Sequence, residues 1–362
     1  MSASSGQALG SWRGRSVLIT GHTGFKGSWL ALWLRQLGAE VHGYALDPPT
    51  QPSLYAVAGI ASLLASDTRA DLADQAQLQA TFAQCQPAVV FHLAAQSLVR
   101  EGYRDPLGTF ATNVLGTAGV LECARHCPSL QALVIVTTDK VYENRESLHA
   151  YREGDRLGGL DPYSGSKAAA ELVSASYRSS YFSAAGPQVA TARAGNVIGG
   201  GDWAVDRLVP DCLRAFAAGR AVQLRYPNAL RPWQHVLEPL AGYLHLASLL
   251  LGHDGARYAR AWNFGPGSEA DATVARVAGI VARLWGSGAR VEAQPDGDHP
   301  HEAGLLRLDS EAAHTVLGWS PRWSLEEALG RTVRWQQAWL AGEDMQELSL
   351  HQIDAYQQAT SQ

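Results

Sequence analysis

The first half of the chain alternates between short apolar runs and stretches with the apolar spacing of a helix. Apolar runs predict strands, and the residues between them predict helices, which is typical of a doubly wound α/β fold around a parallel sheet. The expected strands cover residues 16–20, 41–46, 63–66, 88–93, 132–137 and 189–193. The expected helices cover the stripe Trp29, Leu30, Trp33, Leu34 and Leu37, residues 73–85, residues 113–126 and the residues after 161.

The pattern changes after residue 195, where three consecutive glycines mark a loop. The remaining chain is richer in Trp, Pro and Arg, which favours a smaller second domain that is partly interleaved with the first. The expected organisation is a flexible tail over 1–14, a first domain over 15–195 with a returning segment near 234–265, a second domain over 196–233 and 266–345, and a polar, peripheral segment over 346–362.

Composition narrows the class of protein without identifying it. The 362 residues are 46% hydrophobic and 17% charged, which is ordinary for a globular protein. The net charge of -5 argues against a nucleic-acid binder, and no apolar run approaches membrane-spanning length. The small, polar first residues lack the features of a signal peptide. Four cysteines without metal-binding spacing are expected to be reduced, so a cytoplasmic protein is expected.

A glycine-rich loop follows the first predicted strand and leads into the first predicted helix. Its sequence, Gly-His-Thr-Gly-Phe-Lys-Gly over 21–27, is a variant of the dinucleotide-binding motif. Glycines there permit a tight turn and a close approach to a pyrophosphate, which the helix N-terminus attracts. Small residues after the fourth strand would let a cofactor lie across the sheet. The candidate cofactor-binding residues of both segments are Gly21, Thr23, Gly24, Phe25, Lys26, Gly27, Leu93, Ala94 and Ala95.

Acidic residues near the second and third strands favour NAD over NADP. Asp47 lies 20 residues beyond Gly27, where a carboxylate accepts from the ribose 2′-hydroxyl and repels a 2′-phosphate. Asp67, expected after the third strand, could contact the adenine end of the cofactor. Lys26 and His22 leave NADP open, because either side chain could bind a phosphate or simply the pyrophosphate.

Tyr163 and Lys167 are spaced to share one face of a helix, whose start is indicated by Asp161 as N-cap and Pro162 in the first turn. The Lys charge can lower the pKa of the Tyr phenol, which would give a proton-transfer pair for alcohol and ketone chemistry. The same spacing also arises by chance on many helices. Whether Tyr163 and Lys167 form a catalytic pair therefore depends on the residues around them.

The segment Thr138-Asp139-Lys140 directly follows the fifth predicted strand. Ligands of doubly wound sheets bind at the carboxyl ends of the strands, so we expect this segment in one site with Tyr163 and Lys167. Thr138 can hydrogen-bond a substrate hydroxyl. An acid beside a second amine exceeds what carbonyl reduction requires, although a solvated turn would also explain the pair.

Longer motifs extend over most of the chain. They include Gly-His-Thr-Gly-Phe-Lys-Gly-Ser-Trp-Leu over 21–30, Thr-Asp-Lys over 138–140 and Arg-Pro-Trp-Gln-His-Val-Leu-Glu-Pro-Leu over 231–240. With these motifs the chain resembles the extended short-chain dehydrogenases/reductases of the sugar-nucleotide branch, and within that branch the CDP-glucose 4,6-dehydratases. Lys140 matches this subfamily, since the dTDP-glucose and GDP-mannose dehydratases usually carry Glu there.

The resemblance implies conversion of CDP-glucose to CDP-4-dehydro-6-deoxy-glucose and water, with NAD regenerated in each turnover. Tyr163, assisted by Thr138 and Lys167, would remove the C4 hydroxyl proton during oxidation. Asp139 would protonate the departing C6 hydroxyl, while Lys140 would remove the C5 proton or stabilise the enolate. Arginines bind diphosphates well, and the candidate substrate-binding residues are Gln96, Asn196, Arg207, Arg225, Arg231 and His301.

Two alternatives stay open at this point. Another NAD-dependent sugar-nucleotide dehydratase or a 4-epimerase would share the fold, although simple epimerases usually lack the acid–amine pair. A cofactor-sensing binding protein would more commonly lose the Tyr/Lys pair. No metal is expected, because His299, His301 and Glu302 form an incomplete ligand set. The family resemblance further implies a homodimer or tetramer, and a product used in surface polysaccharide such as lipopolysaccharide.

Overall fold

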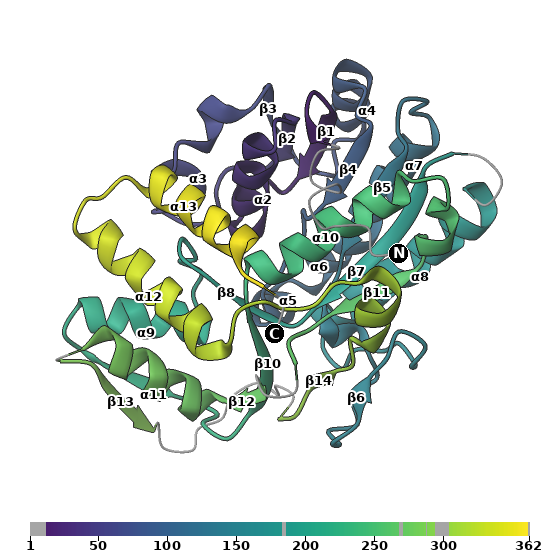
Figure 1. Cartoon of the computed structure of the whole chain (residues 1–362). Coiled ribbons are helices and arrows are strands. Elements are labelled where there is room, and N and C mark those ends of the chain that lie inside the picture. The colour runs from purple at the N-terminus through teal and green to yellow at the C-terminus, as the bar shows by residue number, and fades with distance from the viewer. Residues whose placement is uncertain (1–11, 183–185, 268–270, 287, 294–303, 361–362) are drawn as a thin grey trace.

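A seven-stranded parallel sheet forms the centre of the molecule (Figure 1). The computed structural model describes residues 12–182, 186–267, 271–286, 288–293 and 304–360. The sheet confirms the predicted doubly wound α/β fold. Its strands, in spatial order, are β11 (Ala261–Phe264), β7 (Gln188–Ala194), β5 (Ala132–Val136), β4 (Val89–His92), β1 (Ser16–Thr20), β2 (Glu40–Ala45) and β3 (Ser66–Arg69).

Helices cover both faces of the sheet, which explains why its central strands are apolar throughout. Successive side chains of a strand point to opposite faces. Val17 and Ile19 accordingly belong to one core, and Leu18 belongs to the other. Residues of α2 (Phe25–Gln36), α10 (Leu237–Leu250) and α13 (Met345–Gln358) fill the first core, and those of α4 (Gln75–Cys85), α7 (Gly116–Arg125) and α8 (Pro162–Tyr181) the second.

The remaining long elements build a smaller unit at the carboxyl ends of the strands. They comprise α9 (Leu208–Ala217), α11 (Val274–Trp285), α12 (Leu325–Leu340), the pair β9 (Ala221–Leu224) and β13 (Arg290–Ala293), and the sheet of β12 (Asp271–Thr273), β10 (Leu230–His235) and β8 (Asn196–Ile198). The chain returns to the main sheet at β11, and the predicted domain boundaries stay a prediction. No helix in the described ranges is both long and apolar enough to cross a membrane.

Short elements connect these parts. They are α3 (Leu54–Val57), η2 (Ile60–Leu63), α5 (Val99–Arg104), α6 (Pro106–Phe110), η3 (Ala111–Leu115), η4 (Asp139–Val141), β6 (Ala150–Tyr151), η5 (Gly255–Tyr258), β14 (Arg307–Leu308) and η7 (Ala313–Leu317). The helix expected over 113–126 is α7, preceded by the π-helical turn η3.

The predicted third strand is shifted along the chain. Residues 63–66 were expected to form it, but β3 begins at Ser66 and Asp67 therefore lies within the strand rather than after it. β3 is an edge strand that pairs only with β2. An edge strand with alternately exposed side chains needs no apolar run, so the apolar residues before it predicted the wrong segment.

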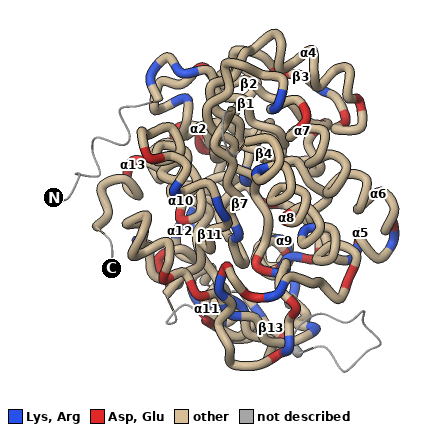
Figure 2. The backbone as a smooth tube through the Cα atoms, turned by 90° about the vertical axis from the view of Figure 1, so that its right-hand side faces the viewer, with Lys and Arg blue, Asp and Glu red and all other residues tan. Residues whose placement is uncertain are grey.

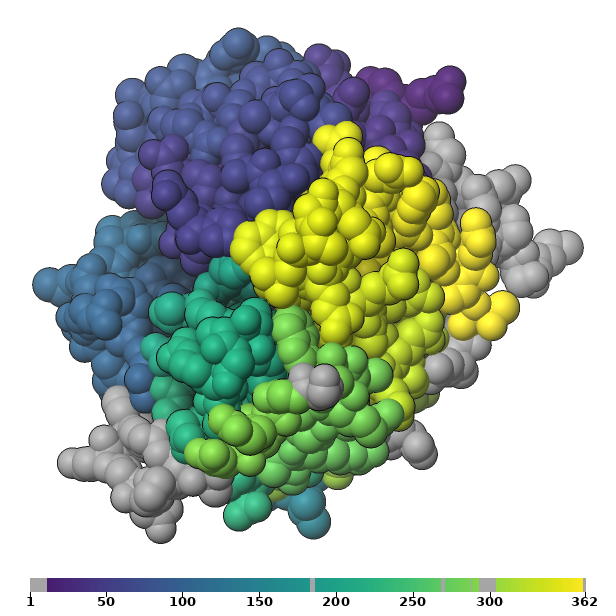
Figure 3. All heavy atoms as spheres, turned by 90° about the vertical axis from the view of Figure 1, so that its left-hand side faces the viewer, coloured from purple at the N-terminus to yellow at the C-terminus, as the bar shows by residue number. Residues whose placement is uncertain are grey.

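The described parts of both predicted terminal segments pack more deeply than expected, while residues 1–11 of the expected tail lie outside the described residues. Trp12, within the expected tail, is fully buried, and its ring lies 6.0 Å from that of Phe91. The segment expected to be peripheral forms α13, which packs against α2 and α12, and Figure 3 shows the yellow C-terminal part against the purple N-terminal part. The few apolar residues of α13, including Ile353 and Tyr356, are buried on one face. Their helical spacing outweighs the polar composition.

Glu238 of α10 ties the C-terminal part of the chain to the first core. Its carboxylate accepts hydrogen bonds from the Tyr356 hydroxyl at 2.6 Å and from the backbone amides of Arg322 and Trp323 at 3.0 and 2.8 Å. Burial nevertheless raises the pKa of Glu238 to about 7, because desolvation outweighs these donors. Folding is therefore linked to the protonation of this side chain.

A Glu238→Gln variant should lose this linkage. The folded-state pKa lies above that of an unfolded Glu, so the contribution of the neutral acid is complete below about pH 4 and is lost as the pH rises through about 7. Relative to Glu238→Gln, the wild type should lose about 3 kcal/mol of stability between about pH 5 and pH 8. Melting temperatures of both proteins over this range measure the difference.

Glu343→Gln is the matched control, because Glu343 is exposed just beyond α12. Its melting temperature should follow that of the wild type at every pH. A constant offset between wild type and Glu238→Gln would show that Glu238 does not titrate in this range.

Candidate active site

A cavity of about 860 Å³ lies between the main sheet and the smaller unit, at the carboxyl ends of β1, β2, β4 and β5. This is where doubly wound sheets bind their ligands. Asp67 lies outside the cavity lining, and His301 lies outside the described residues. His22 is also outside the lining, since it is buried against Asp67, and His299 and Glu302 lie outside the described residues. The other candidate cofactor, catalytic and substrate residues line the cavity, so the fold brings them into one site.

The glycine loop and the start of α2 form a cradle with little room for side chains. Gly21 has a φ of +81°, and a Cβ there would lie 2.6 Å from the backbone nitrogen of Ala94. A Cβ on Gly27 would lie 2.1 Å from the carbonyl oxygen of Gly21. No side chain caps the N-terminus of α2, so its first amides can bind a pyrophosphate. These residues fit a dinucleotide.

The two aspartates expected near the adenosine differ in their surroundings. Asp67 lies 3.0 Å from Arg69 and 2.8 Å from the His22 ring nitrogen, and it also accepts from Tyr55. Burial would raise the pKa of Asp67, but the hydrogen bonds of Tyr55 and His22 and the Arg69 charge keep it below its ordinary value. Asp47 lines the cavity, is 91% exposed and lies 3.9 Å from Arg69, so its carboxylate is accessible to a ligand.

Helix α8 carries Tyr163 and Lys167 on the buried side of the cavity. The predicted start of this helix is confirmed, since Asp161 caps it in a capping box and Pro162 occupies its first turn. Both Tyr163 and Lys167 are less than a tenth exposed. The ammonium of Lys167 donates to the backbone carbonyl of Val136, at the end of β5, at 3.1 Å.

The pKa of Tyr163 is raised rather than lowered in the protein by itself, against the expectation from its spacing to Lys167. Burial is the main cause that raises the pKa of Tyr163 to about 12; a hydrogen bond with Thr138 opposes the shift, and the charge of Asp139 adds to it. Burial also lowers the pKa of Lys167 to about 8, against the influence of Glu171. Desolvation is the largest cause for both groups, and sequence spacing does not reveal it.

Asp139 is a buried acid with one uncommitted oxygen. Its Oδ1 accepts from the Thr138 hydroxyl at 2.9 Å, and its Oδ2 is buried without a hydrogen-bond partner among the described residues. Burial raises the pKa of Asp139, although Lys140, Thr138 and Arg231 oppose the shift. A raised pKa favours the protonated form of this carboxyl, which can donate its proton to a substrate oxygen.

A buried ion pair beneath the cavity was missed by sequence reasoning. Arg193 of β7 donates to Glu171 of α8 at 2.7 Å, and the hydroxyls of Thr137 and Thr191 donate to the same carboxylate at 2.5 and 2.7 Å. Burial would raise the pKa of Glu171, but the hydrogen bond and charge of Arg193 hold it below its ordinary value. The available signal was the position of Glu171, four residues beyond Lys167.

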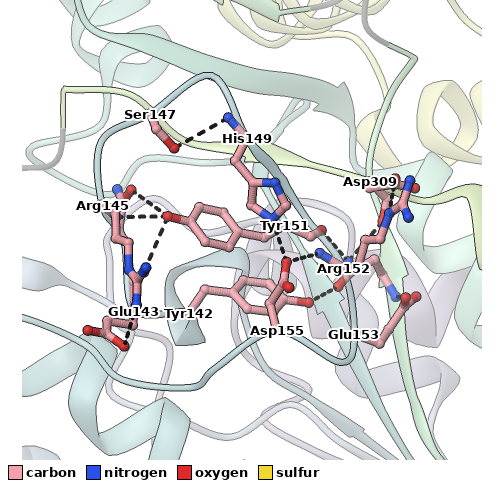
Figure 4. Close-up of polar contacts among 12 residues, drawn as sticks. Tyr142, Glu143, Arg145, Ser147, His149, Tyr151, Arg152, Glu153, Asp155 and Asp309 are labelled. Carbon is pink, nitrogen blue, oxygen red and sulfur yellow. Dashed lines mark hydrogen bonds and ion pairs between the residues drawn. The ribbon is translucent and has the colours of Figure 1, made fainter.

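The segment after the Thr-Asp-Lys turn is braced by contacts among its own side chains and by one to the sheet. Figure 4 shows the polar contacts within this segment and its contact with Asp309. The rings of Tyr142 and Tyr151 stack with centroids 5.1 Å apart, and the Tyr142 hydroxyl donates to Asn263 of β11 at 2.6 Å. β6 pairs with β14, and beside this pair Arg152 lies 2.7 Å from Asp309. The turn that carries the acid–amine pair is therefore held from its C-terminal side as well as from β5.

Several arginines of the smaller unit line the cavity. Arg231 of β10 is 5% exposed, while Arg207 and Arg225 each pair with an aspartate at 2.8 Å. Arg100 of α5 also lines the cavity and lies 3.2 Å from Asp206, a contact that sequence reasoning did not predict. These arginines suit an anionic ligand such as a diphosphate. Within the described ranges, no cluster of three metal-ligating side chains occurs.

The fold and the cavity together define an enzyme that uses a dinucleotide and acts on a second, anionic ligand. The family model described as GDP-mannose 4,6 dehydratase matches residues 18–332. The chain belongs to this dehydratase family.

Curated relatives and solved structures agree with this assignment. The chain is 48% identical to the CDP-glucose 4,6-dehydratase of Salmonella typhimurium, over 97% of this chain and 98% of that protein. It is 30% identical to the dTDP-glucose 4,6-dehydratase of Streptomyces antibioticus, over 88% and 92%. The dTDP-glucose 4,6-dehydratase of Streptomyces venezuelae, solved with NAD and TYD bound, has a TM-score of 0.76 at 25% identity, over 91% and 98%. The predicted fold and resemblance are confirmed.

Gly27→Ala should weaken NAD binding by up to about a hundredfold, because the added Cβ forces the loop and α2 apart. Isothermal titration with NAD measures the change. Gly279→Ala is the matched control, since Gly279 lies on α11 with open space around its Cβ position. That variant should bind NAD as the wild type does, and NAD binding by Gly27→Ala at wild-type strength would contradict the cradle.

Proposed function

We propose that this protein converts CDP-glucose to CDP-4-dehydro-6-deoxy-glucose and water, with NAD as its cofactor. The observation that carries the proposal is the buried Asp139, whose free oxygen lies in a cavity that also holds Tyr163, Thr138 and Lys140. An acid of this kind is needed for loss of water and not for simple oxidation. The 48% identity to a CDP-glucose 4,6-dehydratase supports both the reaction and the nucleotide.

The oxidation requires a base at the C4 hydroxyl of the sugar. Tyr163 suits this role because it shares a hydrogen bond with Thr138, which can pass the alcohol proton to it. Lys167, one helical turn away, provides positive charge that favours the phenolate. The glycine loop and the start of α2 would hold NAD, which would supply a hydride acceptor for C4 and a hydride donor for C6.

The elimination requires an acid at C6 and a base at C5. Asp139 suits the acid, because burial keeps its carboxyl protonated to higher pH than usual. Lys140 is the next residue, and its amine either removes the C5 proton or stabilises the enolate. The brace formed by Tyr142, Tyr151 and Asn263 holds the two side chains in one geometry.

The substrate diphosphate is assigned to the arginines that line the cavity. Arg231 of β10, with Asn196 of the neighbouring strand β8, faces the same space as Arg207 and Arg225. CDP is preferred over dTDP for two reasons. The acid of the pair is followed by Lys140 rather than Glu, and the relative with the higher identity is named for CDP-glucose.

We also infer a homodimer formed through α6, η3 and α8. These elements pack together and expose the apolar side chains of Leu107, Phe110, Leu115 and Leu172. Several exposed large apolar side chains on elements that pack together favour an interaction surface. Light scattering would test it, and a monomeric mass would contradict it. We further expect a cytoplasmic enzyme whose product enters surface polysaccharide such as lipopolysaccharide, as the family resemblance implies.

The purified protein should remove one water from CDP-glucose, and the product mass measures this directly. CDP-glucose deuterated at C4 should give product labelled at C6, because the hydride returns to the same sugar. UDP-, dTDP- and GDP-glucose serve as matched substrates. Faster dehydration of one of these would overturn the choice of CDP, and loss of the label to solvent would overturn the return of the hydride.

Lys140→Ala should block elimination after oxidation, so NADH absorbance should build up while dehydration slows by about a hundredfold or more. Tyr163→Phe, by contrast, should give no NADH. Lys140→Arg keeps the charge but cannot act as a base. Partial rescue by Arg would assign Lys140 to enolate stabilisation, and no rescue would assign it to proton removal. Wild-type turnover in Lys140→Ala would exclude both roles.

A further inference from the structure

Two guanidinium groups from different parts of the fold converge on one carboxylate oxygen. Arg100 of α5, beside the main sheet, lies 3.2 Å from Oδ1 of Asp206. Arg225, directly after β9 in the smaller unit, lies 2.8 Å from the same Oδ1. All three residues line the cavity. Figure 2 shows acidic and basic positions next to one another where α5 and α9 approach.

The loop that carries Asp206 is held at its two ends. Asp202 accepts from the backbone amide of Ala204 at 3.1 Å and from Arg207 at 2.8 Å, and α9 begins at the next residue, Leu208. Between these anchors, Val205 keeps its apolar side chain 57% exposed. Asp206 follows with a φ of +62°, which is unusual for a residue other than glycine. The Asp206 carboxylate is therefore carried by a short stretch of loop between two fixed ends.

The positions of the two arginines match the needs of a diphosphate better than those of a fold contact. Guanidinium groups bind phosphate oxygens strongly, and two of them directed at one anionic oxygen can accept a phosphate in its place. All three side chains are between a quarter and two fifths exposed, and ion pairs at such exposure contribute little to stability. The two arginines can therefore exchange Asp206 for another anion with little loss of folding stability.

The geometry points to Asp206 as an internal substitute for the substrate diphosphate. In the free protein its carboxylate binds Arg100 and Arg225. When the substrate binds, its diphosphate displaces Asp206 and binds both arginines instead. Arg100 thereby becomes a diphosphate-binding residue supplied by the cofactor side of the cavity. The exchange would bring α5 and the β9 end onto the same ligand. This inference rests on the proposed function, because it takes the second ligand to be a sugar nucleotide.

The other charged residues around Asp206, Arg100 and Arg225 are consistent with this assignment. The charge of Asp211 of α9 interacts with the charges of Asp206 and Arg225, and its carboxylate pairs with Arg214 at 2.5 Å. Arg207 is committed to Asp202 and also reaches Ser97 at 3.4 Å, so a second contact crosses the cavity beside the first. Within this group, Asp206 is the carboxylate shared by arginines from both sides of the cavity.

The exchange predicts opposite changes in CDP affinity when the arginine and when the aspartate is replaced. Arg100→Gln should weaken CDP binding by about tenfold, because a phosphate ligand is lost. Asp206→Asn should strengthen CDP binding by about threefold, because the competing charge is removed. Isothermal titration with CDP measures both changes. Cytidine, which lacks phosphates, should bind all proteins equally.

Arg104→Gln is the matched control, because Arg104 is on the same helix, pairs with Glu101 and is not part of the cavity lining. It should bind CDP as the wild type does, and melting temperatures should show that all variants are folded. Unchanged CDP binding in Arg100→Gln would overturn the role of Arg100. Unchanged or weaker binding in Asp206→Asn would show that Asp206 orders the arginines rather than competing with the ligand.

The test separates this inference from the proposed function. UDP, dTDP and GDP carry the same diphosphate, so the binding ratios are measured with whichever nucleoside diphosphate the wild type binds most tightly. Opposite shifts in the two variants support the exchange even where CDP-glucose is not dehydrated. Dehydration of CDP-glucose together with parallel shifts would keep the proposed function and overturn the exchange.

Discussion

The buried ion pair between Glu171 and Arg193 is the interaction on which the geometry of the site depends. Removing two charges from water costs several kcal/mol for each, so such a pair is stable only with good geometry and further hydrogen bonds. Thr137 and Thr191 supply those bonds. Because the pair joins α8 to β7 and to the end of β5, it fixes the helix that carries Tyr163 against the turn that follows β5. Breaking it would leave a lone buried charge and would cost about 3–5 kcal/mol.

Burial then sets the charge states within the cavity. Desolvation disfavours every charged form, so it raises the pKa of Asp139 and Tyr163 and lowers the pKa of Lys167 and Lys26, the last to about 7. A single physical cause therefore favours the protonated form of the acid and the neutral form of the amines. Both shifts act in the direction that the proposed proton transfers require.

Local signals made much of this predictable. The alternating apolar runs predict the sheet, the Asp161–Pro162 helix start is read from adjacent residues, and strand ends indicate where ligands bind. The contacts that the sequence did not predict join residues far apart along the chain. The contacts of Asp67 with His22, and of Asp206 with Arg100, join segments that only the folded chain brings together. The direction of the Tyr163 pKa shift was also missed, because spacing shows the neighbouring charge but not the burial.

Helix α13 has a consequence for how the chain is made. Gln346 donates to the backbone of Ala58, and the Trp33 ring lies 5.6 Å from that of Tyr356. The residues that cover α2 thus leave the ribosome long after α2 itself. Until they emerge, the nascent polypeptide carries an apolar helix face without its partner, which exposes it to aggregation and to chaperones. A fragment cut at the predicted domain boundary would share this defect.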